Sequence, residues 1–357
     1  MSDPERLRAD ATPATFTHLG VIDVGSNAIR LQVARIFEDG SFRVIHDDRE
    51  PVRLGEEVFR TGVLSTEAVQ RALSTLSRYA KLARLQGAHR TRAVATSAVR
   101  EAVNGGLFTR EVALATGLEL EVISGECEAQ LIARGVLSCV NARGSRVALV
   151  DVGGGSTEVS LVERGCILHS ASLPVGSVRL TELICRSDPL ATDDERRLRQ
   201  AVRDAFKSDC ALADPEPYGT VLGSAGTIGA LANFIRRRPS ATRAASFPRA
   251  TFSMRELSRA SAALRKMNLA RRQRAPGIEE RRAEIIVAGS VILEEICAHL
   301  GARTVRVVRR GLRDGLMLEE IERLGLCQPL PAGVAPSEAS GPLVRRVRPR
   351  RRPRETA

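Results

Sequence analysis

The chain has 357 residues, of which 43% are hydrophobic and 3% aromatic, and it contains no tryptophan. This length predicts about two domains whose cores are built mainly from aliphatic side chains. No apolar run approaches the roughly 20 residues that cross a bilayer, and the amino-terminal stretch lacks the apolar segment of a secretion signal. We therefore expect a cytoplasmic globular protein without a membrane partner.

The net charge of +12 lies partly in one terminal segment. Seven arginines lie between 345 and 354, and removing them together with Glu355 leaves a net charge of +6 on the rest of the chain. Residues 328–342 are rich in Pro, Ala, Gly and Ser, so we expect 328–357, like 1–16, to be disordered. The basic tail is either a solvated segment or a contact for a polyanion, and its pattern does not predict specific nucleic-acid recognition.

The seven cysteines and five histidines are scattered along the chain, with no pair at the spacing of a metal site. This distribution predicts reduced thiols and argues against a zinc site.

The first half of the chain begins like a β-meander. Residues 17–37 predict two apolar strands joined by a glycine-containing turn, and 42–54 alternate like a third strand. A helix is predicted over 65–87, since a serine can cap its start and a glycine ends it. Residues 91–105 predict a strand, a turn and a helix start, and 118–138 predict a strand, a glycine turn and a helix.

The same order of elements restarts at Arg146. Three strands with a glycine-rich first turn are followed by helical segments, a strand with a third glycine turn, an arginine-rich helical region, and a last strand and helix. The corresponding ranges are 146–174, 176–212, 219–235, 254–300 and 304–321. The chain is therefore predicted to consist of two similar α/β halves.

Two turns of similar sequence open these halves, "DVGSNAIR" from Asp23 and "DVGGGST" from Asp151. Turns poor in side chains expose backbone N–H groups, and neighbouring hydroxyls add donors, so both turns suit phosphate oxygens. Neither matches a Walker A loop or a dinucleotide-binding fingerprint. The phosphate-binding candidates in these turns are Gly25, Ser26, Asn27, Gly153, Gly154, Gly155, Ser156 and Thr157.

The paired turns resemble those of the actin-like ATPase and sugar-kinase superfamily, in which two domains close on phosphates and a divalent cation. Seven collinear segments also resemble the exopolyphosphatase and guanosine pentaphosphate phosphatase (Ppx/GppA) family in its short form. They are "IDVGSNAIRL", "VATSAVREAVNG", "VISGECEAQLIARGV", "LVDVGGGSTEV", "LPVGSVRLTE", "GSAGTIGAL" and "RRGLRDGLM". The resemblance implies an α/β fold of two duplicated ribonuclease H-like domains, at 17–142 and 143–310, with an interdomain cleft. A helix near 311–325 is expected to pack back on the first domain.

The resemblance also assigns the catalytic carboxylate. The second glutamate of the family's acidic pair falls on Glu128, while Cys127 replaces the first, and Glu126 is the competing candidate. Because neighbouring side chains on a helix point in different directions, we expect the cysteine to matter little.

Asp151 and Glu158 flank the second turn and are expected to hold Mg²⁺, with Mn²⁺ as the alternative. Asp23 lies at the corresponding place in the first turn and either binds cation or water or stabilises the loop. Arg30 and Arg100 are expected to reach a bound anion, since arginine forks match phosphate oxygens.

The third turn, at 223–227, matches the segment that contacts adenosine in related kinases. Its sequence departs from the family at Ala225, as the first turn does at Ala28, so a nucleotide pocket is not established.

The function expected from the resemblance is metal-dependent, processive removal of terminal orthophosphate from inorganic polyphosphate. The alternatives are hydrolysis of the 5′-terminal phosphate of guanosine pentaphosphate, and a non-catalytic sensor that binds polyphosphate or the guanosine alarmone. The motifs leave the choice between these substrates and the oligomeric state open, with a homodimer as one candidate.

Overall fold

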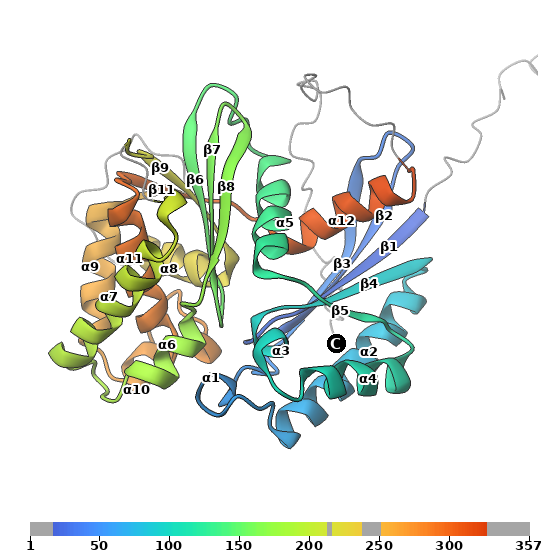
Figure 1. Cartoon of the computed structure of the whole chain (residues 1–357), viewed down its shortest axis with the longest axis horizontal. Coiled ribbons are helices and arrows are strands. Elements are labelled where there is room, and N and C mark those ends of the chain that lie inside the picture. Colours follow the sequence, from blue (N-terminus) through green and yellow to red (C-terminus); the bar gives the residue numbers. More distant parts are fainter. Residues whose placement is uncertain (1–16, 213–215, 238–250, 327–357) are drawn as a thin grey trace, which may run out of the picture.

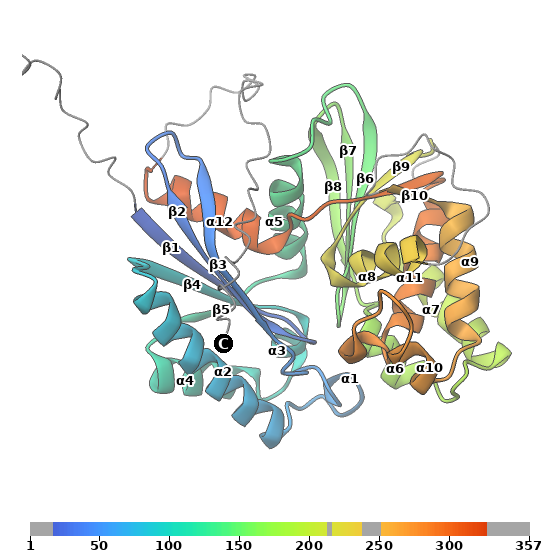
Figure 2. The same cartoon turned by 180° about the vertical axis from the view of Figure 1, so that it is seen from behind.

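The computed structural model describes residues 17–212, 216–237 and 251–326, which form two mixed sheets flanked by helices (Figures 1 and 2). The segments expected to be disordered, 1–16 and 328–357, lie outside the described residues. Among the described residues, no helix is long and apolar enough to cross a bilayer.

The first sheet has five strands in the order β3-β2-β1-β4-β5. Its first three strands form an antiparallel meander, and β4 and β5 add to it in parallel. The strands are β1 (Thr17–Val24), β2 (Ile29–Ile36), β3 (Phe42–Glu50), β4 (Arg90–Ala95) and β5 (Leu120–Val122).

The second sheet repeats this arrangement in the order β10-β11-β9-β6-β7-β8. Again three antiparallel strands are followed by two parallel ones, and β10 pairs at the far edge. The strands are β6 (Arg146–Val152), β7 (Thr157–Glu163), β8 (Cys166–Leu173), β9 (Thr220–Ser224), β10 (Thr251–Ser253) and β11 (Thr304–Val307). The predicted duplication is therefore present in the strand order of the two sheets.

The helices divide between the two halves. The first half contains α1 (Val58–Thr61), α2 (Thr66–Leu85), α3 (Ser97–Glu101), α4 (Gly105–Thr116) and α5 (Gly125–Leu137). The second half contains α6 (Ser177–Ile184), α7 (Thr192–Lys207), α8 (Ala225–Arg237), α9 (Met254–Arg265), α10 (Leu269–Gln273) and α11 (Ile286–His299), and α12 (Leu312–Arg323) follows it in the chain. Two short 3₁₀ turns lie at Cys210–Leu212 and Glu280–Arg282.

Helix α2 shows how local sequence and packing agree. The Ser65 hydroxyl accepts a hydrogen bond from the N–H of Ala68, which satisfies one of the unpaired donors at the helix start. Along the helix, Leu76 and Tyr79 recur at helical spacing and are fully buried against the first sheet, together with Phe108 of α4. The predicted helix over 65–87 is confirmed.

Helix α5 lies between the two sheets (Figures 1 and 2). Leu131 packs with Leu316 of α12 against the first sheet, whereas Ile132 and Val136 pack with Leu149 of the second. Helix α12, the last described element, thus returns to the first sheet, where it contacts α5 and β1. The side chains of α5 therefore join both halves.

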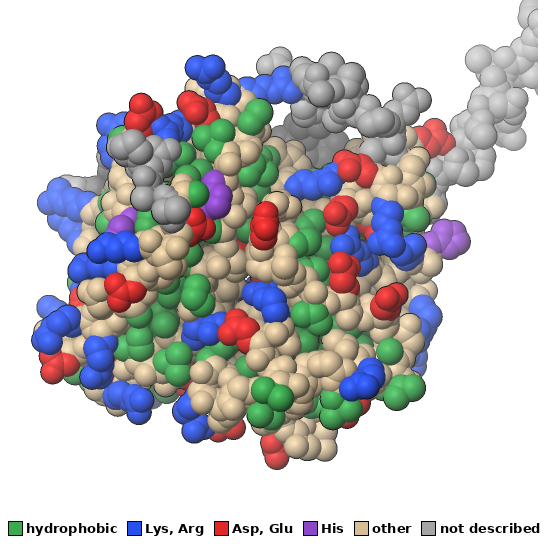
Figure 3. Space-filling view, in the orientation of Figure 1, with side chains coloured by type: hydrophobic (Ala, Val, Ile, Leu, Met, Phe, Trp, Pro, Cys, Tyr) green, Lys and Arg blue, Asp and Glu red, His purple; other side chains and the backbone are tan. Residues whose placement is uncertain are grey.

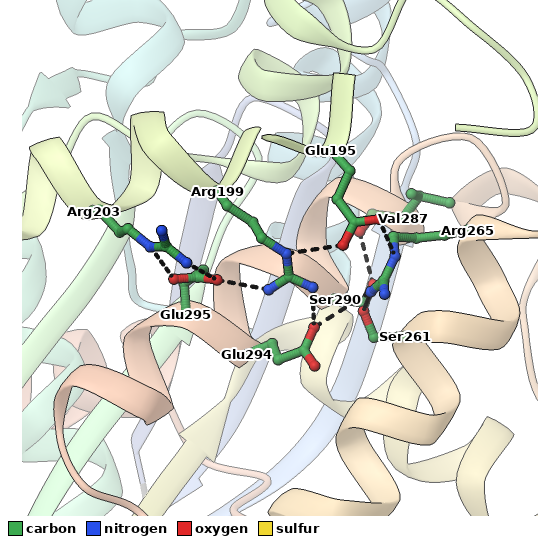
Figure 4. A network of polar contacts seen from close by, with 9 residues as sticks. All are labelled: Glu195, Arg199, Arg203, Ser261, Arg265, Val287, Ser290, Glu294 and Glu295. Carbon is green, nitrogen blue, oxygen red and sulfur yellow. Dashed lines mark hydrogen bonds and ion pairs between the residues drawn. The ribbon is translucent and has the colours of Figure 1, made fainter. Parts of the chain in front are cut away.

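A charge network ties together the helices on the outer face of the second sheet (Figure 4). The guanidinium of Arg199 on α7 binds Glu195, Glu294 and Glu295, at 2.9, 2.9 and 2.6 Å. Arg265 of α9 bonds to the same Glu195 and Glu294 at 3.0 and 3.4 Å. Since several charges share these partners, the network is expected to stabilise the packing of α7, α9 and α11 more than isolated surface pairs would.

On the face seen in Figure 3, basic and acidic side chains are interspersed and form no continuous basic surface.

Candidate active site

A cavity of about 430 Å³ opens between the two sheets, where β1 and β6 end. The glycine turns of both halves line it, and they are in contact: a Cβ on Gly154 would lie 3.1 Å from the Ser26 side chain. The start of α8, the middle of α5 and the linker from β11 to α12 complete the walls. The two turns that the sequence singled out therefore face one space.

The two turns are closed by equivalent hydrogen bonds. The N–H of Gly153 donates to the carbonyl of Ser156 at 3.0 Å, and the N–H of Gly25 donates to the carbonyl of Ala28 at 3.2 Å. In both cases the donor lies two residues after the aspartate and the acceptor five residues after it. The sequence similarity of the turns thus corresponds to a shared backbone structure.

The carbonyl groups of the second turn are held by the start of α6. Gly153 accepts from the N–H of Ser177 at 2.9 Å, and Gly154 accepts from the next two N–H groups at 2.8 and 3.1 Å. Gly155 accepts from the side-chain Nε of Arg179 at 2.6 Å. Three successive carbonyls consequently point toward α6.

In a trans peptide the carbonyl and the following N–H point in opposite directions. The N–H groups of Gly154, Gly155 and Ser156 are therefore turned away from α6, and none of them has an acceptor among the described residues. Successive unpaired amide donors of this kind form an anion-binding concavity.

The first turn is held in a similar way by the chain after β3. The carbonyl of Ser26 accepts from the N–H of Gly55 at 2.7 Å, and that of Asn27 accepts from the N–H of Arg53 at 3.1 Å. The following amides, of Asn27 and Ala28, point away from these contacts and have no acceptor among the described residues. Each half thus contributes oriented amide donors.

Strand register places the acidic residues of the second half on one row. Asp151 pairs with Glu158 across β6 and β7, and Glu158 pairs with Ser172 on β8. The Ser172 hydroxyl donates to Glu158 Oε1 at 2.8 Å, and the Ser224 hydroxyl donates to Asp151 Oδ2. Both carboxylates are thus oriented by hydroxyl donors.

The equivalent row in the first half carries the opposite charge. Asp23 pairs with Arg30 across β1 and β2, and Arg30 pairs with Arg49 on β3. Arginine therefore stands where the second half has Glu158. This difference between the duplicated halves puts the guanidinium of Arg30 at the first turn and the carboxylate of Glu158 at the second.

Glu128 lies in the first turn of α5, whose start is capped by the Ser124 hydroxyl at 3.1 Å from the N–H of Cys127. Its carboxylate is buried, lines the cavity, and accepts from Arg100 Nη1 at 3.2 Å. Glu126 is exposed, bonds to Gln130 on the same helix at 3.2 Å, and lines a separate groove beside β8.

Burial and mutual repulsion raise the pKa values of the clustered carboxyls. Burial raises the pKa of Glu128 well above its usual range, the charge of Glu158 adds to this, and Arg100 opposes it. Burial and the charge of Asp151 raise the pKa of Glu158 to about 7. Burial also raises the pKa values of Asp151 and Asp23, against the hydrogen bond from Ser224 in the first case and the charge of Arg30 in the second.

Most of the residues singled out from the sequence line this cavity. They are Gly25, Ser26, Asn27, Arg30, Glu128, Asp151, Gly153, Gly154, Ser156 and Glu158, together with Asp23, Ala28 and Ala225. Arg100 lies behind the cavity wall, where it contacts Glu128.

Gly155 and Thr157 do not line the cavity. A Cβ on Gly155 would lie 2.4 Å from Phe59 and 2.3 Å from the Ser97 hydroxyl, so this glycine allows close packing between the halves. The Thr157 side chain is fully buried, and its hydroxyl donates to the carbonyl of Val175. The Thr157 hydroxyl therefore does not support the phosphate contact expected of it, whereas the backbone N–H of Gly155 remains one of the unpaired amide donors of the turn.

The sequence predicted no role for Arg282, which completes the site. Arg282 is buried beside the third glycine turn, where a Cβ on Gly226 would lie 1.8 Å from its Nη2. Burial and the charges of Arg49 and Arg30 lower the pKa of Arg282 to about 9. Such crowding of guanidinium groups indicates a place for an anion. Arg282 comes from a 3₁₀ turn far along the chain, without a local motif.

The donor set agrees with a hard divalent cation. The carboxylates of Asp151 and Glu158 belong to paired residues of β6 and β7, and each accepts a hydrogen bond from a serine hydroxyl. Carboxylate oxygens are the ligands that hard divalent cations prefer. Within the described residues, no three His, Cys, Asp or Glu side chains are arranged to hold a metal by themselves. Mg²⁺ is commonly bound by one or two carboxylates together with water and substrate phosphate, so a pair of carboxylates suffices.

The family model of the Ppx/GppA phosphatase family matches residues 33–324, most of the described chain. The chain belongs to the Ppx/GppA phosphatase family. Among its relatives, Exopolyphosphatase 2 of Mycobacterium tuberculosis is 32% identical over 327 residues, which cover 85% of this chain and 98% of that protein. Exopolyphosphatase 1 of Mycobacterium leprae is 30% identical, with 85% and 89% of the two chains covered.

Solved structures of the Ppx/GppA family have the same architecture. The Aquifex aeolicus family member aligns with a TM-score of 0.70 at 27% identity, covering 87% of this chain and 99% of that one. An exopolyphosphatase from Cytophaga hutchinsonii aligns with a TM-score of 0.78 at 23% identity, covering 87% and 100%, and supports the fold alone. The expected α/β fold of two duplicated actin-like domains is confirmed, as is the resemblance to the short form of the family.

Proposed function

We propose that this Ppx/GppA protein is an exopolyphosphatase that hydrolyses the terminal phosphoanhydride bond of inorganic polyphosphate and releases orthophosphate. Its mycobacterial relatives carry the name exopolyphosphatase. The observation that carries the proposal is the pair of turns with oriented amides, one from each half, facing the buried carboxylate Glu128 across one cavity.

The oriented amides are proposed to bind the oxygens of the terminal phosphoryl group. Amide donors fixed by the fold before substrate arrives need no reorganisation when charge shifts during phosphoryl transfer. Arg30, which also lines the cavity, supplies a guanidinium for the oxygens of the neighbouring phosphate.

Glu128 is proposed to orient the attacking water and accept its proton. Burial raises its pKa and so increases the proton affinity of the carboxylate, as a general base requires. Arg100, 3.2 Å from Glu128 Oε2, fixes the carboxylate and opposes this rise of its pKa. Glu126 is unsuited to this role because its side chain is exposed outside the cavity.

Asp151 and Glu158 are proposed to hold Mg²⁺, with Mn²⁺ as the alternative. When bound, such a cation neutralises charge on the phosphate oxygens. The hydroxyls of Ser224 and Ser172 keep the two carboxylates directed toward the cavity. A cation would also offset the repulsion that raises the pKa values of this cluster.

The proposed substrate is a linear polyanion, and repeated removal of terminal phosphate from one bound chain is the expected mode. Arg30, Arg49 and Arg282 line or adjoin the cavity and carry charge that a chain of phosphates would neutralise. Processivity, a cytoplasmic location and a homodimer remain expectations from the sequence.

Phosphate release from polyphosphates of defined length, with guanosine pentaphosphate alongside, tests the proposal. Purified protein with Mg²⁺ is expected to release orthophosphate from polyphosphate, with a higher kcat/KM than for the nucleotide. A higher kcat/KM for guanosine pentaphosphate would favour the alternative phosphohydrolase. Tight binding of either anion without turnover at any divalent cation would favour a sensor.

A further inference from the structure

Arg179, at the start of α6, connects the second glycine turn to the other half of the molecule. Its Nε donates to the carbonyl of Gly155 at 2.6 Å, and its Nη2 donates to Glu101 Oε1 at 2.5 Å. Its guanidinium lies 4.1 Å from the centre of the Phe59 ring, within the range of a cation–π contact. The side chain is only 11% exposed, so these contacts are largely shielded from water.

Two of these three contacts cross the interface between the halves. Phe59 belongs to α1 and Glu101 to α3, both from the first half, and α1 lies beside α6 in both views of the molecule (Figures 1 and 2). The backbone N–H of Glu57, just before α1, also donates to Glu182 of α6 at 2.9 Å. Helix α6 therefore contacts α1 and the preceding residue Glu57, which belong to the first half.

The carbonyl of Gly155 differs from the two before it. The carbonyls of Gly153 and Gly154 are held by backbone N–H groups of α6, whose positions are fixed within the second half. The Gly155 carbonyl is held by the side chain of Arg179, whose own position depends on the first half. Because the Ser156 N–H points opposite to this carbonyl, its direction depends on the same contacts.

Helix α3 brings the catalytic carboxylate into this arrangement. It has five residues, and consecutive side chains at its end reach in two directions: Arg100 to Glu128 and Glu101 to Arg179. Helix α3 therefore holds the Glu128 carboxylate through Arg100. Through Glu101 it also bonds to Arg179, which holds the Gly155 carbonyl of the second turn.

We propose that Arg179 is a positioning residue that directs the third amide of the second glycine turn, at Ser156, when the two halves are closed on each other. The inference rests on the proposed role of this turn in phosphate binding. Arg179 touches no reacting atom and acts through the Gly155–Ser156 peptide.

Two measurements on Arg179→Gln test this inference: the Kd of inorganic phosphate by calorimetry, and kcat on polyphosphate. Loss of one oriented donor to a charged oxygen is expected to weaken phosphate binding about tenfold and to lower kcat by at least as much. A purely structural role would lower the amount of folded protein and leave the Kd of the folded molecules unchanged.

Glu284→Gln is the matched control, because it removes an ion pair of 3.1 Å with Arg53 across the same interface and leaves the turn untouched. It is expected to leave both quantities unchanged. Glu101→Gln should give a smaller loss than Arg179→Gln, and the double variant should be no worse than Arg179→Gln. If Arg179→Gln does not fold, Arg179→Lys serves instead, since lysine lacks the planar fork whose Nε and Nη2 bind Gly155 and Glu101.

An unchanged phosphate Kd in the Arg179 variant, or equal losses in Glu284→Gln, would overturn the inference. Absence of polyphosphate turnover by the wild-type chain would refute the proposed substrate instead, and the calorimetric comparison would still decide the role of Arg179.

Discussion

Replacing Glu158 by glutamine is expected to stabilise the metal-free protein at alkaline pH while removing its response to Mg²⁺. In the folded chain the pKa of Glu158 is raised from its ordinary value of 4.5 to about 7, chiefly by burial. One pKa unit corresponds to about 1.4 kcal/mol, so the ionised side chain costs the fold about 3 kcal/mol above pH 7.

The direction in which stability changes with pH follows from the protons that the folded and unfolded states bind. Between about pH 4.5 and 7 the folded state holds a proton on Glu158 that the unfolded state has lost, so stability falls as the pH rises through this range. Glutamine has no such charge and can still accept the hydrogen bond from Ser172. The variant should therefore equal wild type near pH 4.5 and exceed it by up to about 3 kcal/mol near pH 8.

Urea unfolding with a chelator, near these two pH values, measures the effect. Glu163→Gln, at the partly exposed end of the same strand, is the matched control and should show no pH-dependent difference from wild type. Added Mg²⁺ should then stabilise the wild type near pH 8 and leave Glu158→Gln unchanged. A variant no more stable than wild type near pH 8 without metal would refute the account of this carboxylate.

Two further substitutions test the turn and the charge network. Gly176→Ala would place a Cβ 2.2 Å from the carbonyl oxygen of Gly154, so activity should fall by about 100-fold or more, whereas Gly106→Ala, with open space around it, should be neutral in an activity assay. Arg199→Gln removes one of the two guanidiniums that bind Glu295, while Arg203 keeps that carboxylate paired, and should lower the free energy of unfolding by about 1 kcal/mol without changing kcat/KM. An Arg199 variant as stable as wild type in urea unfolding would show that the network contributes little.

The sequence predicts those parts of the fold where local signals and packing agree. The paired turns after β1 and β6 and the capped helix α2 have clear punctuation and apolar periodicity. Helix α4 is not predicted, since it begins with Gly105 and Gly106 and glycine is a poor helix former. The four-residue α1 and three-residue β10 are too short for a periodic signal and are fixed by tertiary contacts.

In the site as well, features set by local sequence are predictable, whereas those set by tertiary packing are not. The repeated spacing from the two aspartates indicated the turns, whereas Glu128 was assigned by the resemblance to the Ppx/GppA family. The spacing could not distinguish Gly155, which packs against Phe59, from Gly154, which faces the cavity, since these directions depend on the opposite half. Arg282 and Arg179 reach the site through the packing of distant segments, and no local pattern identifies such residues.

Glu128 is proposed to serve the hydrolysis of a terminal phosphoryl group that the two turns hold. The most direct test compares orthophosphate release from polyphosphate, with Mg²⁺, by wild type, Glu128→Gln and Glu126→Gln. The account predicts that Glu128→Gln lowers kcat by about 100-fold or more, as expected for loss of a general base, while Glu126→Gln retains wild-type turnover. Wild-type rates in Glu128→Gln, or a comparable loss in Glu126→Gln, would contradict it.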